Sequence, residues 1–331
     1  MNKLAKQNAK TFGEWAYLAI AKHFSKILKH EVGVLEDKDP EELHQMRVGM
    51  RRLRSAIAGF SDSLDLPKSV TEKKVGKVAR ILGELRDIDV LGEALKNQYQ
   101  PVLPKKEKKK LNEALEVLKT KREEAFDNVK TILEDKLYET LKQAFKDWLE
   151  EPKYQKISQV HIQTVLPELL LPQASKLLLH PAWLVGLEFE EGETKFPDKL
   201  AKKEVEKLLE EQGSVLHELR KEAKRSRYSM ELFTQFYGDN YQNYLNDIKE
   251  IQSILGEIQD CFVLAEFMSE AFESDITNQM PKLAEKLTDT RYKSWQKWAK
   301  LQRKFLDTSM RQNLHLAILN PHATASEAEE N

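Results

Sequence analysis

The stretch LHQMRVGMRRLR, residues 43–54, occurs a second time as LHELRKEAKRSR, residues 216–227. Downstream, ILGELRDIDVL at residues 81–91 is repeated as ILGEIQDCFVL at residues 254–264. Both pairs are offset by 173 residues, from 43 to 216 and from 81 to 254, so the two motifs keep one register. A shared register indicates a duplicated structural unit. Each copy of the first motif opens with a histidine followed by cations, which indicates where a functional site lies.

Helical spacing separates an apolar stripe from a cationic arc in each copy. At about 100° per residue, Leu43, Met46, Met50 and Leu53 share one face, which is typical of a buried helix side. Arg52 lies opposite this stripe, and we expect it to face water. The neighbouring arc carries His44, Arg47, Arg51 and Arg54 in the first copy, and His217, Arg220, Lys224 and Arg227 in the second.

Composition limits the class of protein. The chain has 331 residues, of which 40% are hydrophobic and 32% charged, the profile of a soluble helical protein. Its 53 basic and 54 acidic residues give a net charge of −1, so any attraction to polyanions must come from local clustering of cations.

The compartment follows from cysteine usage and hydropathy. The single cysteine, Cys261, excludes an intrachain disulfide and favours a reducing compartment. It takes the repeat position of Ile88, so we interpret it as a small core residue. The N-terminus lacks an apolar signal core, and no stretch approaches the roughly 20 apolar residues that span a membrane. We therefore expect a cytoplasmic protein with no membrane partner.

Twelve glycines, 11 prolines and the lack of long alternating runs predict an all-α fold. Asp39 and Pro40 form a helix start before the first motif, and Gly213–Ser214 offers a break and a new N-cap before the second. The segment 181–198 is an irregular or hairpin-like excursion without a counterpart in the first half. The predicted helices lie near 8–30, 40–63, 68–98 and 105–149, and then near 163–179, 198–212, 215–237, 240–273 and 280–312.

This organisation predicts two four-helix bundles, residues 1–150 and 151–318, related by a pseudo-two-fold axis. We expect the remaining residues, 319–331, to be a disordered acidic tail.

Metal binding is disfavoured by the repeat. His44 and His217 have Val48 and Lys221 four residues on, so neither has a second ligand on its helix face. Asp89 becomes Phe262 in the second copy, a change that a duplicated metal site would not survive. We expect no metal ligands and no cofactor.

The motif carboxylates have another use. We expect Asp87 and Asp260 to pair with motif arginines and hold their guanidinium groups in place.

Catalysis has no positive signal either. The chain lacks a GxSxG motif, a P-loop, a dinucleotide fingerprint and a Cys–His pair in repeat register. We expect a protein that is not an enzyme.

The cationic arcs leave two interpretations. A histidine near a helix start is often a hydrogen-bonded boundary residue, and an arginine face is often neutralised by glutamates. Here the residue four beyond Arg47 is Arg51, not an acid, and the pattern recurs, which favours anion binding. Arginine forks match phosphate oxygens in pairs, and two arcs suit an extended polyanion. Nucleic acid is not specifically indicated, because Trp15, Trp295 and Trp298 sit at core-like spacings instead of among the cations.

The motifs HQMRVGMRRLR, LGELRDIDV, HELRKEAKRSRYSMELF and LGEIQD closely resemble the conserved histidine α-helical domain (CHAD) family, over roughly residues 8–312. The resemblance implies two four-helix bundles and binding of inorganic polyphosphate in a basic groove or pore formed by the two motif helices. It also implies association with polyphosphate granules. A helical scaffold that binds acidic protein segments or nucleic acid through the same surface is the alternative.

The resemblance implies a set of polyphosphate-binding residues. Arg122 and Arg291 join it by alignment of LKTKREEAF with LTDTRYKSW. The full set is His44, Arg47, Arg51, Arg52, Arg54, Arg122, His217, Arg220, Lys224, Arg225, Arg227 and Arg291.

The two copies differ along the helix that carries LGE. Arg86 becomes Gln259, and Lys77 and Arg80 become Glu250 and Ser253, so we expect a lopsided site. The sequence sets no oligomeric state.

Overall fold

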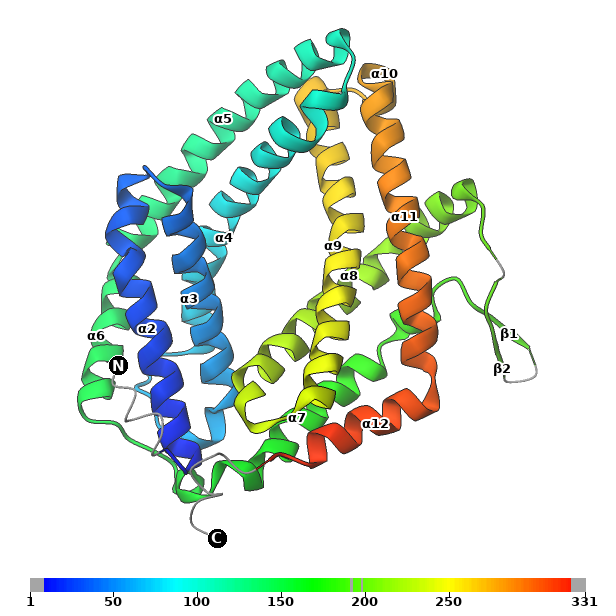
Figure 1. The fold of residues 1–331 in the computed structure, drawn as a ribbon. Helices are drawn as coiled ribbons and strands as arrows, with labels where there is room; N and C mark the ends of the chain where they lie inside the picture. The colour runs from blue at the N-terminus through cyan, green and yellow to red at the C-terminus, as the bar shows by residue number, and fades with distance from the viewer. Residues whose placement is uncertain (1–8, 191–192, 198, 323–331) are drawn as a thin grey trace. The chain divides into compact units, whose positions relative to one another are not determined.

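The computed structural model describes residues 9–190, 193–197 and 199–322 (Figure 1). Within these residues the fold is all-α, as predicted, apart from one short hairpin. Contacts divide the chain into two compact units. Unit 1 holds the chain through Val102 together with Leu111–Val165, and unit 2 holds Leu103–Lys110 and Leu166–His322.

Unit 1 is built from helices whose starts are set by side-chain caps. Thr11 and Glu14 form a capping box at the start of α2. The Asp39 carboxylate accepts a hydrogen bond from the Glu41 amide at the start of α3, as predicted, and Thr71 caps α4. The helices are α2 (Phe12–Glu36), α3 (Pro40–Gly59), α4 (Glu72–Ala94), α5 (Lys105–Glu134, in unit 1 from Leu111) and α6 (Lys136–Glu150).

The prediction of one helix over 105–149 was wrong, because the helix is interrupted at Asp135. This residue has an extended backbone, and its carboxylate accepts a hydrogen bond from the Leu137 amide at 2.6 Å, which starts a new helix. Short turns lie at Ser61–Ser63, Leu95–Tyr99, Gln100–Val102 and Lys156–Gln159.

The apolar stripe of the first motif is the core of unit 1. Leu43, Met46, Met50 and Leu53 are all buried, as the helical spacing predicted. This burial fixes the rotation of α3 about its axis and so places its cationic arc at the edge of the core.

Unit 2 contains a long second helix and a long third one. Its elements are α7 (Ile162–Leu178, in unit 2 from Leu166), β1 (Glu188–Glu190), β2 (Glu193–Lys195), α8 (Lys202–Leu232), α9 (Asp239–Phe272), α10 (Ile276–Gln279), α11 (Pro281–Leu306) and α12 (Thr308–Leu319). The start of α11 is capped by Glu107, which is 4% exposed and accepts hydrogen bonds from the amides of Lys282 and Leu283 at 3.0 Å each.

Two helix ends in unit 2 differ from the prediction. No break occurs at Gly213–Ser214, because a glycine inside a helix costs only about 1 kcal/mol. Leu209 and Leu216 extend one buried stripe across it. A break does occur at Asp307, whose carboxylate accepts a hydrogen bond from the Met310 amide at 2.8 Å and starts α12.

The excursion at 181–198 is anchored to unit 2 and ends in the β1–β2 hairpin. Trp183, 1% exposed, stacks on Trp298 and Phe305 with ring centroids 5.1 and 5.0 Å away. The Gln302 amide donates to the carbonyls of Trp183 and Val185 at 2.8 and 2.9 Å. The base of the excursion is therefore part of the core of unit 2.

No described helix is long and apolar enough to cross a bilayer. Of the predicted tail, Leu319 ends α12, and residues 323–331 lie outside the described residues.

Candidate functional site

The cationic arc of unit 1 lies along α3 beside α4. His44, Arg47, Arg51 and Arg54 are half-buried. Arg47 Nη2 donates to Asp87 Oδ1 at 3.2 Å, which confirms the predicted pairing of Asp87 with a motif arginine.

A second carboxylate of α4 reaches the far end of this arc. Arg54 Nη2 donates to Glu72 Oε1 at 2.7 Å. The arc thus carries its own counterions at Arg47 and Arg54.

Glycines on α4 give these arginines room. A Cβ at Gly83 would lie 3.3 Å from Arg47 Nε, and one at Gly76 would lie 3.3 Å from Arg54 Nε. The glycine of the LGE motif is therefore the surface on which the arginine lies. This role was not predicted from the sequence, although the recurrence of LGE in both copies was a signal for it.

The arc of unit 2 lies along α8 in the same way. His217, Arg220, Lys224 and Arg227 are half-buried. A Cβ at Gly256 would lie 3.3 Å from Arg220 Nε, which repeats the contact between Gly83 and Arg47.

The two arcs differ in their counterions. Among the described residues no carboxylate forms an ion pair with Arg220, and its buried Nε lacks a hydrogen-bond partner. Arg227 Nε lies 3.6 Å from Glu231 Oε1, and its guanidinium lies 4.5 Å from the centre of the Tyr228 ring. With no carboxylate competing for its guanidinium, Arg220 is well placed to bind an external anion.

Arg52 and Arg225 occupy equivalent positions in different surroundings. Arg52 is half-buried, which corrects the expectation that it faces water, and it lies near enough to Lys26 of α2 for the two charges to repel each other. Arg225 is 65% exposed, and its Nη1 donates to Glu222 Oε2 at 2.8 Å.

The environment of His44 favours its neutral form. Burial lowers the pKa of His44, and the cations Arg86, Arg51 and Arg47 lower it further, against an opposing effect from Glu41. The largest cause is burial, which the charge pattern did not reveal.

His217 follows the same rule. Its pKa is lowered first by burial and then by Lys221 and Arg220. A side-chain hydrogen bond with Gln259, the repeat counterpart of Arg86, opposes this effect. Both motif histidines are thus neutral at pH 7.

Arg122 is held by two aspartates. Its Nη1 and Nη2 donate to Asp37 at 2.7 and 2.6 Å, and its Nε donates to Asp89 at 2.8 Å. The hydrogen bonding of Arg122 to Asp37 is the largest cause of its raised pKa. Asp37 ends α2 in the left-handed backbone region, with φ 51°, and so turns its carboxylate toward α5.

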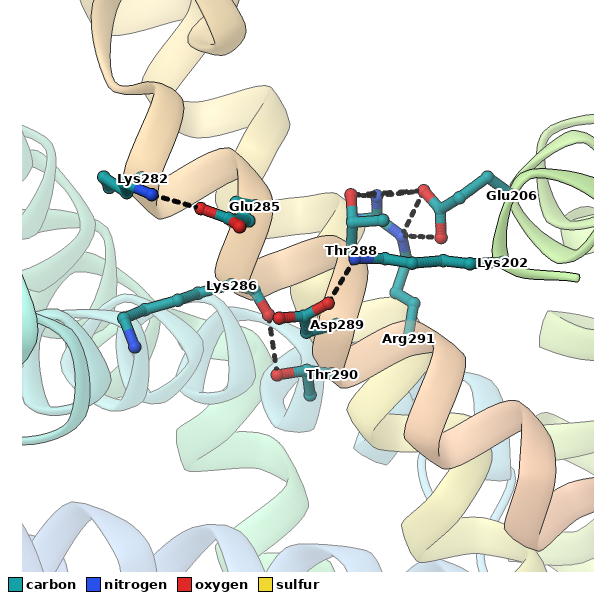
Figure 2. Close-up of polar contacts among 9 residues, drawn as sticks. All are labelled: Lys202, Glu206, Lys282, Glu285, Lys286, Thr288, Asp289, Thr290 and Arg291. Carbon is teal, nitrogen blue, oxygen red and sulfur yellow. Dashed lines mark hydrogen bonds and ion pairs between the residues drawn. The ribbon is translucent and has the colours of Figure 1, made fainter.

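Arg291 is held in a similar way in unit 2. It is 8% exposed, its Nε lies 3.1 Å from both carboxylate oxygens of Glu206, and its Nη2 donates to Thr288 Oγ1 at 3.0 Å (Figure 2). Its guanidinium lies 4.7 Å from the centre of the Phe262 ring. Because Phe262 takes the repeat position of Asp89, Arg291 and Arg122 contact equivalent positions of the two copies.

Metal binding and thiol chemistry have few candidate residues. No three His, Cys, Asp or Glu side chains of the described segments are grouped so that they could hold a metal ion. Cys261 is 3% exposed and is a core residue, as predicted. Each arc is cationic, half-buried and made mainly of arginines, with one histidine.

An all-α chain with two equivalent His/Arg helices and two LGE helices defines a class of protein, and comparison with known families gives it a name. The sequence model of the CHAD domain matches residues 18–269. The chain belongs to the CHAD domain family, which is associated with polyphosphate.

Two solved structures share the fold. One is the crystal structure of the CHAD domain from the plant Ricinus communis, with 23% identity, 92% of each chain covered and a TM-score of 0.56. The other is PptA from Streptomyces chartreusis, with 14% identity, 92% of this chain and 99% of that chain covered, and a TM-score of 0.60. No curated protein matches the sequence.

Proposed function

We propose that this protein binds inorganic polyphosphate through the cationic arcs of α3 and α8. The observation that carries the proposal is Arg220, a half-buried motif arginine without a carboxylate partner among the described residues. Its surroundings support an external anion as the missing partner, and membership of a family associated with polyphosphate supports the identity of that anion.

The ligand is a polymer and not a single phosphate. One phosphate engages one or two guanidinium groups, whereas an extended chain adds many such contacts on one molecule. Both arcs engage one polymer, in the basic groove or pore that the CHAD resemblance implies. Charge reversal at Arg51 and at Lys224 should therefore each weaken binding strongly, and the double change should cost less than the sum.

Titration of the purified protein tests this function. Long-chain polyphosphate, orthophosphate, a DNA duplex and a polyglutamate peptide are compared at several salt concentrations. Tight, salt-sensitive binding of the polyphosphate alone supports the proposal, since counterion release makes such binding steeply salt-dependent. Equal affinity for orthophosphate overturns it, and a preference for DNA or for the acidic peptide makes the protein a scaffold for those partners.

The protein acts by binding and not by catalysis, in the cytoplasm and on polyphosphate granules. Neither arc pairs a histidine with a nucleophile or a second general base. Release of orthophosphate from polyphosphate, with or without magnesium or manganese, would overturn this part of the proposal.

A further inference from the structure

The cationic surface of unit 1 extends beyond the motif helix onto α2. Lys22 and Lys26 lie one helical turn apart on α2 and share a face. The two helices approach closely, because a Cβ at Gly49 of α3 would lie 2.9 Å from the Ile27 side chain. Lys26 interacts electrostatically with Arg52 of α3, so the cations of the two helices form one cluster.

Two cations of this cluster, Lys26 and Arg52, are poorly neutralised by the protein. Among the described residues no carboxylate forms a hydrogen bond or ion pair with Lys26 or Arg52. Burial and the nearby cations lower the pKa of Lys26, and only Glu41 opposes them. Like charges held this close destabilise a fold unless a counter-charge joins them.

Beneath the cluster lies His23, which is 6% exposed. Burial, with the charges of Lys22, Arg52 and Lys26, lowers its pKa to about 3. It is therefore neutral at pH 7 and does not add to the repulsion.

In the second copy of the motif, the counterpart of Arg52 is neutralised by a carboxylate. Glu222 takes the repeat position of Gly49, three residues before Arg225, and accepts the hydrogen bond from Arg225 at 2.8 Å. In α3 the same position is a glycine, so Arg52 has no such partner. The first helix of unit 2, α7, carries one basic residue, Lys176, where α2 carries three. The lack of a carboxylate partner at Lys26 and Arg52 is thus a property of unit 1.

Arg51 joins this cluster to the arc already described. It acts electrostatically on both His44 and Lys26. A chain of phosphate groups that follows α3 past Arg51 therefore meets the cations of α2 with no acidic side chain paired to Lys26 or Arg52.

We propose that Lys22, Lys26 and Arg52 form an additional phosphate subsite, continuous with the arc of α3 through Arg51, which unit 2 lacks. This inference rests on the proposed binding of polyphosphate and adds residues of α2 to it. It makes unit 1 the half that holds a long polymer more tightly.

A charge-matched pair of variants tests the subsite. Lys26→Gln/Arg52→Gln removes two cations from the cluster. Lys136→Gln/Lys146→Gln removes two cations elsewhere, namely two exposed lysines of α6. We expect the first pair to weaken binding of long-chain polyphosphate about tenfold or more at low salt. It should also lower the slope of log Kd against log salt by roughly one unit for each lost contact. The control pair should change either quantity little.

Two further measurements separate the subsite from a structural role. Without ligand, Lys26→Gln/Arg52→Gln should unfold at the same or a higher temperature, because it relieves repulsion. Lys26→Arg/Arg52→Lys, which keeps both charges, should retain the affinity for long-chain polyphosphate. A loss of affinity that follows a loss of thermal stability, or that the charge-keeping variant shares, overturns the subsite.

Arg47→Gln distinguishes a failure of the subsite from a failure of the proposed polyphosphate binding. If the wild-type protein binds polyphosphate and Arg47→Gln weakens binding while the cluster variant matches its control, only the subsite is wrong. If the wild-type protein does not bind polyphosphate, the proposed function itself fails.

Discussion

Arg47 Nη2 donates a hydrogen bond to Asp87 Oδ1 across 3.2 Å. The Asp87 carboxylate therefore competes with phosphate for Arg47. The Asp87 side chain is 72% exposed, and an ion pair of this kind stabilises a fold by about 0–1 kcal/mol. We expect Asp87→Asn to leave the unfolding temperature nearly unchanged. It should raise the affinity for polyphosphate roughly two- to fivefold at low salt, an effect of the same small size. Isothermal titration at two salt concentrations measures it.

Asp127→Asn on α5 is the matched control, because Asp127 is 70% exposed and pairs with Lys130 at 2.5 Å. It should not change the affinity. Equal gains from both variants would mean that net charge alone acts, and weaker binding by Asp87→Asn would mean that the carboxylate positions Arg47.

The glycine beneath each motif arginine gives a second prediction. Gly256→Ala places a Cβ 3.3 Å from Arg220 Nε, so the guanidinium must shift by a few tenths of an ångström. A helical Gly→Ala change removes a penalty of about 1 kcal/mol. We therefore expect unchanged or higher thermal stability together with weaker binding of polyphosphate.

Gly213→Ala in α8 is the control, since a Cβ there meets nothing within 4 Å. It should stabilise the protein by up to about 1 kcal/mol and leave binding unchanged. If both alanine variants bind polyphosphate equally well, Gly256 does not determine the position of Arg220.

Most of the fold could be predicted because local signals agree with tertiary ones. The stripe through Met46 and Met50 is buried, and Asp39 caps α3, as the spacing indicated. Gly213 led to a wrong prediction of a helix break, because the free-energy cost of one helical glycine is small compared with the burial of a continuous apolar stripe. Asp135 was missed because a capping aspartate looks like any surface acid within a long amphipathic run.

The site could be predicted only where it lies along one helix. Spacing along α3 and α8 placed the arcs, and the repeat placed Asp87. Contacts between segments that are far apart in the sequence cannot be inferred from residue spacing along one helix. The hydrogen bonds of Arg122 to Asp37, 85 residues earlier, and of Arg291 to Glu206 could not be read from the chain. The position of Arg52 against α2 depends in the same way on packing.

Arg291 tests how much of the implied binding set contacts ligand. The side chains of Arg291 and Glu206 are 9% and 19% exposed, and breaking a buried pair of this kind costs about 3–5 kcal/mol. We expect Arg291→Met to lower the unfolding temperature strongly. Arg291→Lys, which loses the fork but keeps the charge, should lower it less.

Polyphosphate affinity, measured on the folded fraction of Arg291→Lys, should change far less than in Arg220→Lys. Glu206→Gln should share the stability loss of the arginine variants. Lost affinity with full stability in Arg291→Lys would instead support direct contact with phosphate.

The motif histidines predict the pH dependence of binding. Burial and neighbouring cations lower the pKa of His44 and His217 in the free protein, so both are neutral at pH 7. A bound polyanion favours the imidazolium, and binding then takes up protons. Affinity should rise as pH falls from about 8 toward 6, by at most roughly tenfold per pH unit for each proton taken up. His44→Gln/His217→Gln should flatten this dependence.

The stability of the fold has the opposite pH dependence, so it must be measured together with binding. A histidine whose folded pKa lies below its unfolded value stabilises the fold only above the unfolded pKa, and the stability is lost as pH falls below about 6.5. Binding is therefore measured at pH 8, 7 and 6 at constant ionic strength, with thermal unfolding at each pH. Calorimetry in buffers of different ionisation enthalpy counts the protons taken up. An affinity that is flat in the wild-type protein, or a pH slope that survives the double substitution, would exclude these histidines as the coupled groups.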